Sequence, residues 1–137
     1  MKIIEDAALS TPPGESPNHW VERFRVPDLS VGTYSIPARG TDDQAPHHED
    51  EIYVVPGGRA ILTSDSAAAA VQAGSVIYVP AGEQHSFTQV TEDLTLLVIF
   101  APACESRQRC QHPCPALAGT GCCRRPSPPS PSTSAAG

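Results

Sequence analysis

The sequence predicts an all-β fold, a sandwich or barrel assembled from short strands. Many runs of strand length are rich in Val, Ile, Tyr, Phe and Thr, and Pro- or Gly-containing turns separate them. No window of a dozen residues keeps a helical period of apolar side chains. The 137 residues correspond to about one domain.

The first half of the chain contains four expected strands. Runs 21–26 and 29–36 are separated by Pro27-Asp28, and Pro37 to Gly40 ends the second run. Runs 51–55 and 59–63 flank Pro56-Gly57-Gly58, which we expect to be a turn between them.

The second half contains four more expected strands. Run 68–71 follows a polar turn, and run 75–79 starts after Gly74 and ends at Pro80-Ala81-Gly82. Runs 85–90 and 94–100 flank Thr91-Glu92-Asp93, which we also expect to be a turn.

Composition divides the chain into three parts. Residues 1–19 contain three prolines and are predicted to be an N-terminal arm or edge segment, followed by one domain over 20–104. Residues 105–137 are rich in Pro and Ser, and we expect this tail to be disordered. A zinc knuckle is the alternative there, although its spacing matches no common zinc pattern, and the abrupt change in composition would also fit a shifted reading frame. The knuckle would use Cys110, His112, Cys114, Cys122 and Cys123.

The charge balance argues against two classes of partner. Residues 1–103 carry 5 Lys or Arg against 14 Asp or Glu, so no basic surface for nucleic acid or an anionic membrane is expected. No run of about 20 apolar residues is present, and the N-terminus lacks the apolar core of a secretory signal. A cytoplasmic protein is therefore expected.

Two stretches contain the residues that could carry chemistry. In residues 40–58, His47 and Glu51 precede a β-like run that ends at Gly58. In residues 74–89, Gly74 is followed by Pro80-Ala81-Gly82 and then by His85, at the head of another β-like run.

Together these stretches resemble the two motifs of the cupin superfamily. Gly74, Pro80, Gly82 and His85 match the second motif position for position, whereas Gln89 replaces its Asn. In the first motif His-x-His-x(3,4)-Glu-x(6)-Gly, the second His, the Glu and the Gly are matched by His47, Glu51 and Gly58. The resemblance covers about residues 20–103 and implies a small cupin domain, a double-stranded β-helix or jelly-roll-like barrel.

Strand alternation independently favours a metal site. His47 and Glu51 share one phase, so if this phase and that of His85 both face the barrel interior, the three side chains converge. Two imidazoles and a carboxylate suit one divalent ion of Fe, Mn, Ni, Zn or Co. His48, Glu49 and Asp50 are instead expected to form a solvated acidic loop.

One ligand of the usual cupin set is missing, because Ala45 occupies the position of the first His. Gln44 could replace it through its amide oxygen, and Asp43 is a weaker substitute. A bulge could also exchange His48 for His47. A site of three ligands fits the sequence as well as one completed by Gln44, and a barrel that binds no metal is the third alternative.

These features lead to two functional hypotheses. The first is a metal-dependent enzyme, dioxygenase-like or isomerase- or lyase-like, acting on a small organic substrate in a pocket with Tyr53, Arg59 and Gln89. Tyr53 could equally be a core ring and Arg59 a rim charge. The second is a non-catalytic domain that binds or senses a small ligand, because the fold does not fix the function. No hydrolase triad, phosphate loop or dinucleotide motif is visible.

We also expect a homodimer. Small cupins often pair through outer strands, and the arm with run 21–26 is the edge that a second copy would cover.

Overall fold

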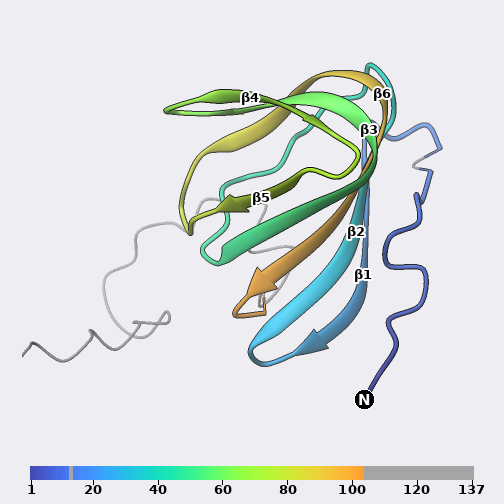
Figure 1. The fold of residues 1–137 in the computed structure, drawn as a ribbon, viewed down its shortest axis with the longest axis vertical. Helices are drawn as coiled ribbons and strands as arrows, with labels where there is room; N and C mark the ends of the chain where they lie inside the picture. Colours follow the sequence, from blue (N-terminus) through green and yellow to red (C-terminus); the bar gives the residue numbers. More distant parts are fainter. Residues whose placement is uncertain (13, 104–137) are drawn as a thin grey trace, which may run out of the picture.

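The computed structural model describes residues 1–12 and 14–103. In this part of the chain six antiparallel strands form (Figure 1). They are hydrogen-bonded in the order β1-β2-β6-β3-β4, and β5 also pairs with β3. No helix in these ranges could span a membrane. The strands are β1 (His19–Val26), β2 (Leu29–Ile36), β3 (Asp50–Ser64), β4 (Ala68–Gln72), β5 (Val76–Val79) and β6 (His85–Ala101).

The two longest strands, β3 and β6, bend together and give the molecule its barrel shape (Figure 1). One half of the pair runs from Asp50 opposite Ala101 to Gly57 opposite Thr95, and continues the sheet of β1 and β2. The other half ends with Ser64 opposite His85 and carries β4. The all-β prediction and the jelly-roll-like barrel are confirmed.

Two predicted turns are wrong, because Pro56-Gly57-Gly58 and Thr91-Glu92-Asp93 lie inside β3 and β6. Both segments sit where the β3–β6 register shifts, so they bend continuous strands instead of ending them. Gly58 permits the bend: its φ is +98°, and a Cβ there would meet the Asp93 carbonyl oxygen and Leu94 Cα. The chain therefore has six strands over the described residues where eight were expected.

The core fills the inner side of the folded sheet. Alternate residues of β3 and β6 point inward, and Tyr53, Val55, Leu96 and Val98 are almost completely buried. Trp20 of β1 packs against this core from the edge. The interior of the barrel is therefore lined mainly by aliphatic and aromatic side chains.

The N-terminal segment lies against the outer side of β2 (Figure 1). Thr33 Oγ1 donates to the Ala7 carbonyl oxygen at 2.8 Å, and the Thr11 amide donates to Ser35 Oγ at 3.0 Å. These contacts explain why small polar side chains of β2 are buried on the face away from the core. The predicted tail at 105–137, with its zinc-knuckle alternative, lies outside the described residues.

Candidate functional site

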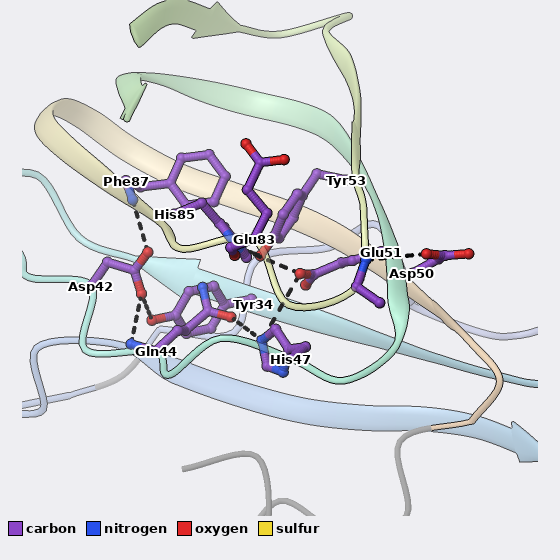
Figure 2. Close-up of polar contacts among 11 residues, drawn as sticks. Tyr34, Asp42, Gln44, His47, Asp50, Glu51, Tyr53, Glu83, His85 and Phe87 are labelled. Atoms are coloured by element: carbon purple, nitrogen blue, oxygen red, sulfur yellow. Dashed lines mark hydrogen bonds and ion pairs between the residues drawn. The ribbon is translucent and has the colours of Figure 1, made fainter. Parts of the chain in front are cut away.

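The barrel brings together three of the predicted site residues from distant parts of the chain (Figure 2). Glu51 is the second residue of β3, and His85 begins β6. Strand β3 also pairs with β5, so that Glu51 lies opposite Val79 at the end of β5, and residues 80–84 then return the chain to His85. Glu51 Oε2 consequently lies 3.3 Å from His85 Nε2.

The Glu51 carboxylate is the most unusual group of the site. It is 1% exposed, and neither of its oxygens has a hydrogen-bond partner among the described residues. Two histidines lie close to it: His85 Nε2 is 3.3 Å and His47 Nε2 is 3.9 Å from Glu51 Oε2. Because burying an ionised carboxylate is costly unless a cation or donors compensate it, this position calls for a positive charge.

His85 presents its Nε2 to the carboxylate in a fixed orientation. Its Nδ1 is 2.9 Å from the Glu83 carbonyl oxygen, so Nδ1 carries a proton and donates there. Burial alone would lower the pKa of His85, but its close contact with the Glu51 carboxylate and its hydrogen bond to the Glu83 carbonyl oxygen outweigh that effect and raise the pKa above the ordinary 6.5.

His47 lies in the loop before β3 and is 8% exposed. Its Nε2 is 3.2 Å from Gln44 Oε1, and its ring packs edge-on against Phe100 at a centroid distance of 4.7 Å. Burial lowers the pKa of His47, with partial compensation by the Glu51 charge. The Gln44 amide nitrogen and His47 Nδ1 are buried without a hydrogen-bond partner in the described part of the chain.

Tyr53 places its hydroxyl directly in the site. The side chain is 0% exposed, and the hydroxyl oxygen is 2.9 Å from His85 Nε2. Burial, together with the Glu51 charge, raises the pKa of Tyr53 well above 10.0, so the hydroxyl keeps its proton. While His85 is neutral, Tyr53 donates to Nε2; once His85 is protonated, Nε2–H donates instead.

Two other predicted pocket residues lie elsewhere, and their assignment to the site is corrected. Arg59 has a side chain that is 60% exposed and forms an ion pair with Glu92 at 3.2 Å. Gln89 is exposed with φ +48°. The cause is the bulge between Thr88 and Glu92, where β6 carries two more residues than β3 and its alternation breaks.

The neighbours that could have replaced a ligand point away from the site. His48 is exposed, and Asp43 is exposed and accepts a hydrogen bond from Asn18 Nδ2 at 2.6 Å. Sequence reasoning missed a different acid, Asp42, which contacts three elements around the site (Figure 2). Its only local signal is its position two residues before Gln44, which allows a turn closed by its side chain.

The donor types fit a divalent metal ion, whereas their spacing fits only in part. No three His, Cys, Asp or Glu side chains in residues 1–12 and 14–103 already form a metal-binding group. Adjacent donors of one ion, each ~2.1 Å from it, lie about 3.0–3.4 Å apart. The Glu51–His85 distance of 3.3 Å and the Gln44–His47 distance of 3.2 Å agree, and the Glu51–His47 distance of 3.9 Å is wider.

The fold and this site define a small β-barrel domain with a buried cluster of imidazole, carboxylate and phenol groups. The chain belongs to the cupin family, since the family model for the cupin domain matches residues 32–100. It is 45% identical over 83 residues to the uncharacterized protein SCO3923 of Streptomyces coelicolor, which covers 61% of this chain and 79% of that protein.

Solved structures share this fold. TT1209 from Thermus thermophilus has a TM-score of 0.65 at 20% identity, covering 75% of this chain and 99% of that one. The DMSP lyase DddQ from Ruegeria pomeroyi has a TM-score of 0.61 at 16% identity, covering 77% of this chain and 57% of that one. At such identities the likeness concerns the fold alone.

Proposed function

We propose that this cupin domain binds one divalent transition metal through His47, Glu51, His85 and Gln44, and uses it in an enzyme reaction on a small organic substrate. The observation that carries the proposal is the buried Glu51 carboxylate, whose two oxygens lack hydrogen-bond donors among the described residues. A cation between Glu51 and the two imidazoles would satisfy all three groups at once.

The chemistry of the donors narrows the choice of ion. Imidazole nitrogen with carboxylate and amide oxygen suits Fe, Mn, Ni, Zn or Co in the divalent state, and no thiolate is near to favour a soft metal among the described residues. His85 Nδ1–H donates to the Glu83 carbonyl oxygen, so in the neutral ring Nε2 carries no proton, as a metal ligand requires.

The reaction class that we propose is dioxygenase-like or isomerase- or lyase-like. A bound metal would supply Lewis-acid activation of a substrate oxygen or, as iron, a centre for oxygen chemistry. The chain itself would contribute a water-poor site, a negative charge at Glu51, and a protonated Tyr53 hydroxyl held beside His85. A lyase is included because the Ruegeria structure, which has the same fold, is named a DMSP lyase.

A second candidate function is binding or sensing of a small ligand without turnover. Its support is the enclosure of the site: the side chains of Glu51, His85 and His47 are only 1%, 2% and 9% exposed. A site so closed suits a ligand that enters rarely and is held tightly. Product formation from a bound ligand would decide for the enzyme, and tight binding with no product for the sensor.

Metal analysis of the purified full chain tests the proposal. Protein produced with Fe, Mn, Ni, Zn and Co supplied should carry about one transition metal ion per chain by elemental analysis. His47→Ala should lose it, whereas His48→Ala, a matched change at the exposed neighbour, should keep it. Metal-free wild-type protein, or equal losses in the two variants, would refute the site.

We also propose a homodimer with two-fold symmetry. The support comes from a surface other than the edge at run 21–26 that the sequence predicted. Exposed apolar side chains lie on two neighbouring strands: Ile52 of β3 is opposite Tyr78 of β5, and Val76 of β5 is also exposed. A cytoplasmic location, a small-molecule partner and the absence of nucleic-acid or membrane partners stay predictions from the sequence.

A further inference from the structure

The loop that carries Gln44 and His47 lies outside the strands, so no strand ladder fixes these two side chains. Glu51 and Tyr53 are held by β3, and His85 by β6. The loop instead follows the 82–90 segment in the opposite direction. The Arg39 amide donates to the Val90 carbonyl oxygen at 2.8 Å, and the Gly82 amide donates to the His47 carbonyl oxygen at 2.7 Å.

Asp42 lies between these two backbone contacts in the sequence, and its side chain adds further hydrogen bonds. Its Oδ2 accepts from the Phe87 amide of β6 at 2.8 Å. Its Oδ1 accepts from the Tyr34 hydroxyl of β2 at 2.9 Å and from the backbone amide of Gln44 at 3.2 Å. One carboxylate therefore joins β2, β6 and the loop (Figure 2).

The position of these bonds matters for the site. Phe87 is two residues from His85 on β6. Gln44 is itself one of the proposed metal ligands, and its backbone amide is one of the groups bonded to Asp42. We infer that Asp42 is a positioning residue, which holds Gln44 and His47 in register with His85 and Glu51. This inference rests on the proposed metal function, because it assigns Asp42 the task of completing that donor set.

The chemistry of the partners makes Asp42→Asn a sharp test. All three partners of the carboxylate are donors, so both of its oxygens must accept. An amide keeps the shape of the side chain but replaces one oxygen with an NH2 group, which then faces a donor. Asp43→Asn is the matched control: Asp43 is exposed and its Oδ1 accepts from Asn18, so an amide in its place can turn its oxygen to that donor.

The first measurement needs no metal. In chelator-treated full-length protein, amide hydrogen exchange followed by NMR should be at least about tenfold faster at Gln44 and Phe87 in Asp42→Asn, and unchanged in Asp43→Asn. Unchanged exchange at both amides in Asp42→Asn would overturn the positioning role. This measurement stays decisive even if the wild type binds no metal, an outcome that would defeat only the proposed function.

The second measurement is a Co²⁺ titration followed by visible absorption. Asp42→Asn should weaken binding at least about tenfold and alter the absorption bands, while Asp43→Asn should leave both unchanged. In a Gln44→Ala background, which keeps the other three proposed ligands, the effect of Asp42→Asn should shrink, because one of the two side chains that Asp42 positions is gone. Additive effects, or equal weakening by Asp43→Asn, would overturn the inference.

Tyr34→Phe provides the test if Asp42→Asn fails to fold. It removes one donor from Asp42 Oδ1 and leaves both oxygens as acceptors, so Co²⁺ binding should weaken a few-fold. Unchanged Co²⁺ affinity and unchanged exchange at Gln44 in a folded Tyr34→Phe protein would contradict the positioning role.

Discussion

Replacement of Glu51 by Gln in metal-free protein should make stability fall more steeply with falling pH than it does in the wild type. In the wild type the pKa of His85 lies above the ordinary 6.5, so its contribution is complete below 6.5 and is lost as pH rises through the raised value. The pKa of His47 lies below 6.5, so its contribution is present above 6.5 and is lost as pH falls. The two histidines therefore oppose each other.

Glu51→Gln removes the charge that supports both imidazolium forms. Burial then dominates at both histidines, and stability should fall as pH falls through the ordinary histidine range. At the 3.3 Å between Glu51 and His85, the Coulomb energy is about 5 kcal/mol for an effective dielectric constant of about 20, which is a ceiling. After desolvation, we expect the stability difference between wild type and variant to widen by about 2–4 kcal/mol from about pH 8 to about pH 5.5.

Urea denaturation of chelator-treated protein at several pH values measures this difference. Glu5→Gln makes the same change of charge at an exposed position in the N-terminal segment and should follow the wild type. If wild type and Glu51→Gln lost stability in parallel as the pH fell, the coupling between Glu51 and the histidines would be refuted.

Three further changes test the fold and the assembly. Gly58→Ala should lower the free energy of unfolding by about 1–3 kcal/mol, since φ is +98° and the new Cβ meets β6. Gly57→Ala, with open space around it, should cost less, and equal losses in a denaturant titration would contradict the bend. Tyr53→Phe should cost about 1–3 kcal/mol in metal-free protein by leaving His85 Nε2 without its donor, whereas exposed Tyr78→Phe should be near neutral; a neutral Tyr53→Phe would show that this bond contributes nothing to stability. Light scattering at high micromolar concentration should return twice the mass of one chain, and a monomer mass would contradict the dimer.

Period-two patterns made the strands and part of the site predictable. Glu51 and Tyr53 share a phase because nothing interrupts β3 between them, and both side chains are buried at the site. The bend was not predictable from the same patterns. Pro56-Gly57-Gly58 has the composition of a turn, and only its pairing with β6 distinguishes a turn from a bulge within a continuous strand.

The misplaced residues have the same physical origin. Gln89 was predicted from the phase that it would share with His85, and Arg59 from its place at the start of a separate strand. Both residues lie where the β3–β6 register shifts. Asp42 was missed for another reason: its role depends on Tyr34 and Phe87, which are distant in sequence and belong to different strands. A short loop acid carries no local mark of such partners.

The double-length strand pair also governs when the site can exist during folding. Glu51 lies opposite Phe100 near one end of the β3–β6 pair, and His85 lies opposite Ser64 at the other end. In an intermediate with only half of this pair formed, the β3–β6 ladder fixes the backbone of one of the two residues and not that of the other. Pairings of such sequence separation form slowly, so we expect a ligand that needs both residues fixed to bind the intermediate more weakly than the native state. Its binding energy would then stabilise the native state alone and lower the rate of unfolding and proteolysis.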